Sequence, residues 1–278
     1  MIQIKNISYT VKNKIILDDI SFSIQRGDCI ALLGANGSGK TTLLEILTGV
    51  LKPTEGTISF DGRNFDKYKR YTGVVWDNIT IYPWFKVTEV IKYVSSLYKV
   101  KVDDKLYNDL QIDVIANKLM KFLSVGELKR VQILLSLLHN PQLVIMDEGT
   151  SELDPYVRNI VWENLLSSDR TIIFTTHNWK EAEEYANKVV FLSNGSLVLE
   201  PCDINVLFNR VSLKEKVVID EIIPVDISPD YILHRKKIFF IQEKDANIKL
   251  ERIKKQTSKF TVLPIELIDI YQYIINKR

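Results

Sequence analysis

The sequence predicts an α/β fold in which helices pack on a mostly parallel sheet. Three short, unbroken apolar runs support this prediction. A strand that is buried on both faces of a parallel sheet shows no alternation of polar and apolar residues. These runs are Cys29–Leu33, Leu143–Met146 and Thr171–Thr175. Helical patterns at Thr42–Thr48 and Pro155–Leu166 follow the first and second runs. Strands that alternate with helices are typical of layered α/β proteins.

The segments around these runs follow from turn and periodicity signals. Before the first run, turn signals at residues 13–14 and 26–28 separate the expected strands, which are Ile2–Tyr9, Ile15–Leu17 and Ser21–Ile24. Residues 88 to about 140 look mainly helical, and Asn140-Pro141 ends this region. Its clearest helices are Thr88–Tyr98 and Gly126–His139.

Length and composition describe an ordinary globular chain. Its 278 residues suffice for one sizeable domain with an appendage or for two modest domains, and 46% of them are hydrophobic. The net charge is +2, from 37 basic and 35 acidic residues, so composition gives no reason to expect binding to nucleic acid. Cys29 and Cys202 lie too far apart in sequence to suggest a metal-ligand pair, and they fit buried apolar side chains in a reducing compartment.

No segment predicts a membrane anchor. Residues Met1–Asn6 alternate like a strand and lack the apolar core of a signal peptide. No stretch of the sequence approaches the roughly 18 apolar residues that a membrane-spanning helix needs. We therefore expect a chain that is soluble by itself and that reaches any membrane through a partner.

From about residue 200 onward the pattern is that of a second, smaller α/β unit without a catalytic motif. Its expected strands and helices are Lys237–Ile241, Asn247–Lys255, Phe260–Leu263 and Ile265–Asn276. The basic residues of its first helix are typical of a solvated face. We accordingly divide the chain into residues 1–200 and 201–278, with a helical subdomain at about 78–140.

A phosphate-binding loop follows the first apolar run. It reads Gly34-Ala35-Asn36-Gly37-Ser38-Gly39-Lys40-Thr41 and lies between a buried strand and a helix that continues through Thr42. Its glycines let successive amides point at phosphate oxygens, and the helix N-terminus adds its dipole. Lys40 is expected to reach the β- and γ-phosphates, the Thr41 hydroxyl to bind Mg²⁺, and Thr42 to contact the bound ATP. The alternative, a glycine-rich turn before a helix, is disfavoured by these flanking elements.

Two acids end the second apolar run. Asp147 is placed to hold the Mg²⁺ shell, and Glu148 can polarise the attacking water. Read alone, the segment would be a core strand that ends in solvated acids. The phosphate loop makes the catalytic interpretation the stronger one.

Five motifs stand in a fixed order, and Ser124 and Asp147 are 23 positions apart. The motifs are Gly34–Thr41, Leu123–Glu127, Leu143–Glu148, Ser151–Asp154 and His177. Together they resemble the nucleotide-binding subunit of an ATP-binding-cassette (ABC) transporter over about residues 1–200. The resemblance implies a P-loop NTPase core with a mixed sheet, an N-terminal antiparallel β part and a helical subdomain, binding ATP and Mg²⁺.

The resemblance also implies roles for single residues. Glu148 would be the general base, and His177, which follows a strand end, would contact the γ-phosphate. A lone histidine more often has a core or capping role, but the context Thr175-Thr176-His177 reverses that preference. Tyr9 lies 25 positions before Gly34, where the family has an aromatic that stacks on adenine. As an alternative, Tyr9 is a half-buried strand tyrosine.

The partners implied by the resemblance are a second cassette and transmembrane subunits. The signature residues Ser124, Val125, Gly126 and Glu127 would face ATP held by the other cassette, with Ser151 and Asp154 at the same interface. Two cassettes, alike or different, would then pair head to tail. The chain would lie on the inner face of the cell membrane, bound to separate transmembrane subunits, and no nucleic acid partner is expected.

Several positions depart from the family pattern. Asp77 stands where a glutamine usually joins Mg²⁺ and the attacking water, so we expect either a slower or differently coupled ATPase or the use of Asn78 instead. Val125 replaces a glycine, so its turn must form without a left-handed residue. Glu152 replaces a small residue and Gly149 a proline. Because Glu148 is retained, the pattern indicates an active hydrolase.

The region Tyr82–Tyr98 resembles cassettes of the multidrug and peptide-antibiotic export type, which favours export. Trp84 replaces a usually polar residue and could dock onto a membrane partner; the alternative is packing within the helical layer. Two other functions fit the same motifs. One is a soluble, non-transport ABC ATPase, and the other is a weakly hydrolysing regulatory cassette.

Overall fold

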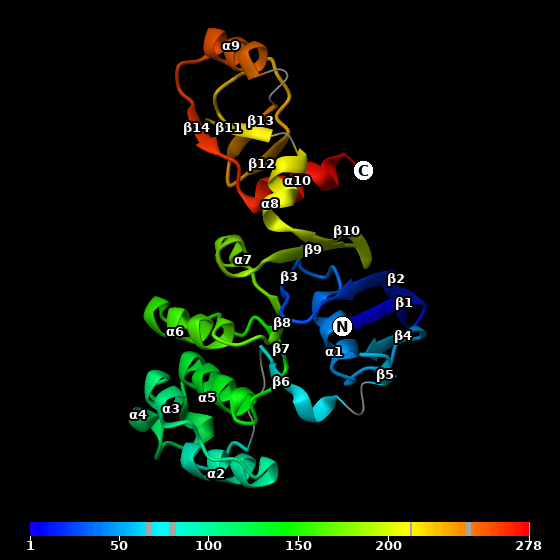
Figure 1. Cartoon of the computed structure of the whole chain (residues 1–278). Coiled ribbons are helices and arrows are strands. Elements are labelled where there is room, and N and C mark those ends of the chain that lie inside the picture. Colours follow the sequence, from blue (N-terminus) through cyan, green and yellow to red (C-terminus); the bar gives the residue numbers. More distant parts are fainter. Residues whose placement is uncertain (65–67, 78–81, 212, 243–245, 278) are drawn as a thin grey trace. The chain divides into compact units, whose positions relative to one another are not determined.

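The structure is a computed structural model that describes residues 1–64, 68–77, 82–211, 213–242 and 246–277. The chain forms two compact units, Met1–Pro201 and Cys202–Arg278 (Figure 1). Within the described part of the chain, every helix is too short or too polar to span a lipid bilayer.

The first unit begins with a four-stranded antiparallel sheet in the order β2-β1-β4-β5. Its strands are β1 (Ile2–Val11), β2 (Lys14–Ile24), β4 (Glu55–Phe60) and β5 (Arg63–Asn64). The strands expected at Ile15–Leu17 and Ser21–Ile24 are parts of one strand, β2, so only their separation is wrong. The strand continues because the ladder to β1 shifts register around Asp19, which takes a positive φ of 50°. Such a bulge absorbs the polar residues without ending the strand.

The central sheet has six strands in the order β10-β9-β3-β8-β7-β6. Four of its pairs are parallel, namely β3 with β8 and β9, and β7 with β8 and β6. Their bounds are β3 (Cys29–Leu33), β6 (Thr72–Val75), β7 (Leu143–Asp147), β8 (Thr171–Thr175), β9 (Lys188–Ser193) and β10 (Ser196–Asp203). Every residue of β3, β7 and β8 is buried, which confirms that the three apolar runs form inner strands.

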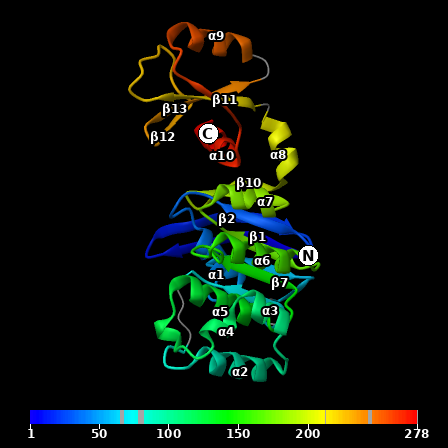
Figure 2. The ribbon, with the colours of Figure 1, turned by 90° about the vertical axis from the view of Figure 1, so that its left-hand side faces the viewer.

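Helices cover both faces of this sheet. Helix α1 (Lys40–Leu47) lies between the central and the antiparallel sheets, and its Leu43, Leu44, Ile46 and Leu47 join the core cluster shared with both. Helices α5 and α6 cover the opposite face (Figures 1 and 2). The other helical elements are η2 (Lys69–Tyr71), α2 (Val87–Tyr98), α3 (Asp104–Asp109), α4 (Ile112–Ile115), η3 (Met120–Phe122), α5 (Val125–Leu137), α6 (Pro155–Leu166) and α7 (Trp179–Tyr185).

The second unit is a four-stranded antiparallel sheet between two helices. The sheet has the order β12-β13-β11-β14. Its elements are α8 (Ile204–Val211), β11 (Leu213–Asp220), β12 (Tyr231–Leu233), β13 (Lys236–Gln242), α9 (Ala246–Gln256), β14 (Thr261–Pro264) and α10 (Leu267–Asn276). Ile253 of α9 packs on one face with Val217 and Phe239. On the other face, buried Lys216 pairs with fully buried Asp269 of α10 at 2.7 Å.

The two cysteines lie where composition suggested. Cys29 is buried in β3, and Cys202 is buried at the start of the second unit; both thiols are free. Burial raises the pKa of the Cys29 thiol to about 12, so this side chain stays a neutral apolar group.

Candidate functional site

The phosphate loop joins the carboxyl end of β3 to the first residue of α1. Gly34 begins the loop with a φ of 156°, and a Cβ atom placed there would lie 2.2 Å from the carbonyl oxygen of Leu192. Only glycine fits such a close approach of two backbones. The phosphate loop therefore starts where the end of β3 lies against Leu192 of β9.

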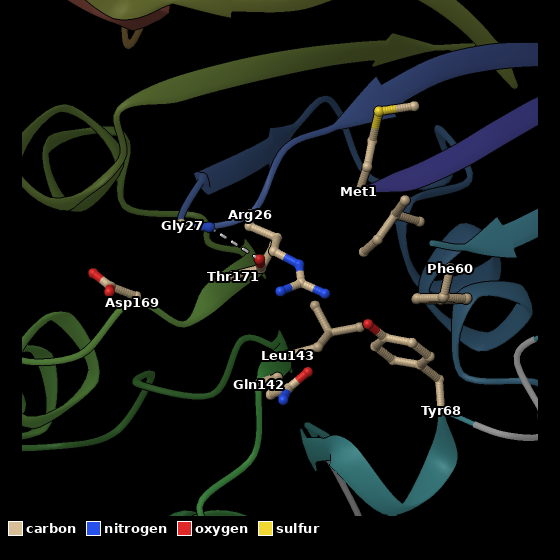
Figure 3. Close-up of a pocket in the computed structure, with 10 residues that line it drawn as sticks. Met1, Arg26, Gly27, Phe60, Tyr68, Gln142, Leu143, Asp169 and Thr171 are labelled. Atoms are coloured by element: carbon tan, nitrogen blue, oxygen red, sulfur yellow. Dashed lines mark hydrogen bonds between the residues drawn. The ribbon is translucent and has the colours of Figure 1, made fainter. Parts of the chain in front are cut away.

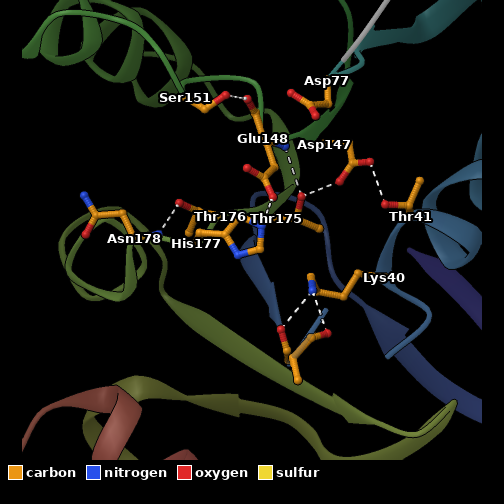
Figure 4. A network of polar contacts seen from close by, with 12 residues as sticks. Lys40, Thr41, Asp77, Asp147, Glu148, Ser151, Thr175, Thr176, His177 and Asn178 are labelled. Carbon is orange, nitrogen blue, oxygen red and sulfur yellow. Dashed lines mark hydrogen bonds and ion pairs between the residues drawn. The ribbon is translucent and has the colours of Figure 1, made fainter. Parts of the chain in front are cut away.

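Lys40 is folded back onto this loop (Figure 4). Its Nζ donates to the carbonyl oxygens of Gly34 at 2.8 Å and Ala35 at 3.1 Å. The residue is only 8% exposed, and burial lowers the pKa of the ammonium while the charges of Glu148 and Asp147 act in the opposite direction. Phosphate oxygens can replace the two carbonyl acceptors, so the lysine is placed for the predicted role.

Asp147 is held by a hydroxyl on each side (Figure 4). The Thr41 hydroxyl donates to Oδ2 at 2.8 Å, and the Thr175 hydroxyl donates to Oδ1 at 2.6 Å. A buried carboxylate beside a hydroxyl suits Mg²⁺, which takes oxygen ligands and usually keeps several waters. Among the described residues, no cluster of three or more His, Cys, Asp or Glu side chains could hold a metal alone. Phosphate and water oxygens would have to complete the shell of this ion.

Glu148 lies directly against His177. The histidine Nε2 is 2.5 Å from Glu148 Oε1, and the backbone N–H of Glu148 donates to the Thr175 hydroxyl at 3.0 Å. Glu148 itself takes a left-handed conformation with φ 51°. Burial raises the pKa of its carboxyl, as do the charges of Asp77 and Asp147, whereas His177 and Lys40 act in the opposite direction. A raised pKa makes the carboxylate a better base near neutral pH.

Asp77 belongs to the same group of charges, and it has a partner that the sequence analysis missed. Lys129 of α5 lies 3.4 Å from its Oδ1, and the lysine is fully buried while the Asp77 side chain is 44% exposed. Asn78, the alternative ligand, lies outside the described residues. The available sequence signal was a lysine among the apolar residues of a buried helix, where a charge is unusual.

The signature residues begin helix α5. Ser124 is its N-cap, and its Oγ accepts from the Glu127 N–H at 3.2 Å, while Glu127 Oε2 accepts from the Ser124 N–H at 2.9 Å. This capping box uses the serine oxygen as an acceptor, so its O–H can still donate to a phosphate. Val125 is the first helical residue and keeps a negative φ, as its turn requires.

The signature and the interface loop enclose one open hollow of about 460 Å³. Its lining comprises Ser124, Val125, Gly126, Glu127, Arg130, Glu152, Leu153 and Asp154, with no residue of the phosphate loop. A Cβ atom on Gly126 would lie 2.6 Å from the Glu152 carbonyl oxygen, so glycine is required at this contact. Asp154 caps α6 by accepting from the Val157 N–H at 3.1 Å. The hydroxyl of Ser151 donates to the Glu148 carbonyl oxygen at 2.7 Å.

Glu181 of α7 is a second residue that the sequence analysis missed. Its buried carboxylate accepts from the Thr150 hydroxyl at 2.5 Å, the Thr176 hydroxyl at 2.6 Å and the Trp162 indole at 3.0 Å. It thereby joins the loop after β7, which carries Glu148, to the segment after β8, which carries His177. No local pattern reveals such a residue, because glutamate is usually exposed.

Tyr9 lies on the antiparallel sheet, beside Leu17, whose side chain lies next to Gly39 of the phosphate loop. It is half-buried in β1 opposite Leu17 and packs against the main core cluster. This environment agrees with the strand-tyrosine alternative, and stacking on adenine stays a prediction.

A cavity of about 450 Å³ lies at the other end of the central strands (Figure 3). It is lined by residues at the amino ends of β7 and β8, including Leu143 and Thr171. The guanidinium of Arg26 beside it is paired with Asp61 at 2.6 Å. The phosphate loop and the acids lie at the carboxyl ends, so this cavity is separate from their site.

The arrangement is that of a P-loop nucleotide-binding protein, since a phosphate loop and an acidic strand end share one edge of a parallel sheet. A family model described as ABC transporter matches residues 17–151. The Nod factor export ATP-binding protein I of Cupriavidus metallidurans is 32% identical over 215 residues, which cover 72% of this chain and 70% of that protein. The lantibiotic transport ATP-binding protein SrtF of Streptococcus pyogenes is 31% identical over 228 residues, or 78% and 99% of the two chains.

A solved structure of an ATP-binding subunit of an ABC transporter has the same fold. Its TM-score is 0.71 at 23% identity, and the match covers 76% of this chain and 93% of that one. The chain belongs to the ABC transporter family, as one of its ATP-binding subunits. The predicted fold class is confirmed.

Replacing Glu181 with glutamine should destabilise the protein. The amide of Glu181→Gln keeps one acceptor oxygen and turns a nitrogen toward groups that donate, so we expect a loss of about 1–3 kcal/mol in the free energy of unfolding. Urea unfolding without nucleotide measures this loss. Glu163→Gln, on the exposed side of α6, is the control, and equal stability of the two variants would contradict the linking role of Glu181.

Proposed function

We propose that this chain hydrolyses ATP and thereby drives transport through separate transmembrane subunits. The observation that carries the proposal is the contact of Glu148 with His177 at 2.5 Å, beside the Thr41–Asp147 pair. The residues proposed as base, orienting histidine and Mg²⁺ ligands come together at the carboxyl ends of β7 and β8 and at the start of α1, which supports hydrolysis of a bound nucleotide.

Each residue of the site has a defined task in this mechanism. The loop amides and Lys40 bind the phosphates, and Thr41 and Asp147 would hold Mg²⁺. The ion, when bound, neutralises phosphate charge. Glu148 accepts a proton from the attacking water, and the contact with His177 fixes the direction of its carboxylate. The burial that raises the pKa of Glu148 also strengthens it as a base.

We infer a head-to-tail pair of cassettes from the hollow at Ser124–Glu127. The hollow offers a serine O–H and the N-terminus of α5, both suited to an anion, yet the phosphate loop of the same chain contributes nothing to its lining. A second cassette can supply the missing phosphate. The loop beside this hollow is fixed by two contacts. The Ser151 hydroxyl donates to the Glu148 carbonyl oxygen, and Asp154 caps α6.

We infer that the transmembrane partner docks on exposed aromatic residues of the helical subdomain. Trp84 is 71% exposed, so it does not pack within the helical layer, and Lys121 Nζ lies 3.5 Å from the centre of its ring. Tyr82, Phe85, Tyr93 and Phe122 are exposed in the same subdomain. Large exposed aromatic groups of this kind are typical of protein interfaces.

Export is the direction we propose for transport. Two relatives carry the words Nod factor export and lantibiotic transport in their names, and the aromatic segment at Tyr82–Tyr98 resembles export cassettes. The same names do not favour the soluble, non-transport alternative. The cargo would be selected by the transmembrane subunits.

Replacing the general base should trap the closed dimer. We expect Glu148→Gln to lower ATP turnover by roughly 10²–10⁴-fold, because the amide cannot accept the proton of the water. With MgATP the variant should sediment as a dimer, whereas Lys40→Ala, which lacks the phosphate contact, should stay monomeric. Turnover of Glu148→Gln close to that of the wild type would refute the role of Glu148.

Removing the exposed indole should weaken assembly and leave nucleotide binding intact. We expect Trp84→Ala to reduce the amount of co-purified transmembrane subunits by about tenfold, as loss of an interface anchor does. Val114→Ala, also 71% exposed but on α4, is the control. A Trp84→Ala variant that assembles normally yet hydrolyses ATP more slowly would show that docking is not the role of Trp84.

A further inference from the structure

A fully buried lysine lies behind the ATP site. Lys129 is in the second turn of α5, is 1% exposed, and donates from Nζ to the Trp76 carbonyl oxygen at 3.0 Å. Its other acceptor is Asp77 Oδ1 at 3.4 Å. A buried ammonium is costly unless an opposite charge stabilises it, so the Asp77 carboxylate is the group that makes this position tolerable for a lysine.

Asp77 in turn lies between this lysine and the catalytic acids. Figure 4 shows it beside Asp147 and Glu148, on the segment that follows β6. Burial raises the pKa of the Glu148 carboxyl, and the charge of Asp77 adds to this effect, so the two carboxylates interact electrostatically. The charges of Asp147 and Glu148 also act on Lys129. Lys129 and the three carboxylates therefore form one electrostatic group.

The positive charge of Lys129 explains how the site tolerates the negative charge of Asp77. A carboxylate at the position where a neutral glutamine is expected adds one negative charge close to the place where ATP phosphates bind. Lys129 adds one positive charge within hydrogen-bonding reach of the same carboxylate. A carboxylate without this counter-charge would repel the phosphates, because charges in a partly buried site are weakly screened.

We propose that Lys129 is a positioning residue of the ATP site, which neutralises Asp77 and fixes its carboxylate next to Glu148. The proposal rests on the proposed function, because it assigns the role toward bound ATP. Lys129 also ties the segment after β6 to α5, whose first residues form the signature. The segment after β6 and the signature at the start of α5 would each contact a bound ATP, and the Lys129–Asp77 ion pair links them.

The test is a double-mutant cycle in the full chain, with Lys129→Met, Asp77→Asn and the double variant. Binding of MgATP is measured by equilibrium dialysis in the Glu148→Gln background, where hydrolysis does not interfere. A unit charge within about 10 Å, at an effective dielectric constant of about 20, changes an affinity by roughly tenfold. We expect Lys129→Met to raise the Kd by about that factor, and the added Asp77→Asn to bring it back to within about threefold of the starting value.

Thermal unfolding without nucleotide is the second readout. Asp77→Asn alone leaves a buried ammonium without its carboxylate and should lower the Tm by roughly 5 °C, whereas the double variant should recover most of this loss. Lys92→Met, which removes an exposed charge from α2, controls for net charge.

Two results would overturn the proposal. One is an unchanged Kd for Lys129→Met, and the other is a raised Kd that Asp77→Asn does not restore, as expected if Lys129 only supports folding. Failure of the proposed function is distinguishable, because the wild-type protein would then bind MgATP without hydrolysing it, whereas the Kd values of the cycle do not depend on hydrolysis.

Discussion

The parallel pairing of β3, β8 and β7 is the constraint on which the rest of the molecule depends. Parallel strands bring their carboxyl ends to one edge of a sheet, so the segments that follow them become neighbours whatever their separation in sequence. Cys29 lies opposite Ile172, and Ile172 opposite Val144, which fixes the register of all three strands. The phosphate loop, the acidic pair and the histidine segment meet at this edge because of that register.

Hydrogen bonds then convert this proximity into a defined geometry. The hydroxyl of Thr175 serves two groups at once, since it donates to Asp147 and accepts from the Glu148 N–H. The buried carboxylate of Glu181 ties the loop behind Glu148 to the segment behind His177. Lys129 adds the positive charge that a third carboxylate at Asp77 demands. Each of these contacts joins a strand end to a neighbouring element. The positions of the site residues therefore depend on contacts between elements and not on the local loop conformation.

The sequence predicted the elements whose signals are local. The run Cys29–Leu33 and the helix Pro155–Leu166 were found with bounds that match the structure, because burial, a proline and a capping Asp154 mark them directly. It did not predict β11 or β12, whose pattern is weak, and it divided β2 where a bulge keeps the strand intact. The roles of Lys129 and Glu181 were not predicted for a different reason. Asp77 lies 52 positions from Lys129 and Thr150 lies 31 positions from Glu181, and only the folded chain brings each pair together.

A mixing experiment tests most directly whether each ATP site is shared between two cassettes. Lys40→Ala removes the phosphate contact and Ser124→Arg blocks the signature, so either variant alone should be inactive. A mixed dimer contains one site with an intact Lys40 from one chain and an intact Ser124 from the other. An equimolar mixture should therefore recover up to about half of the wild-type ATPase rate, since neither variant pairs productively with itself and each mixed dimer has one working site out of two. A mixture that stays as inactive as its components would contradict the shared site.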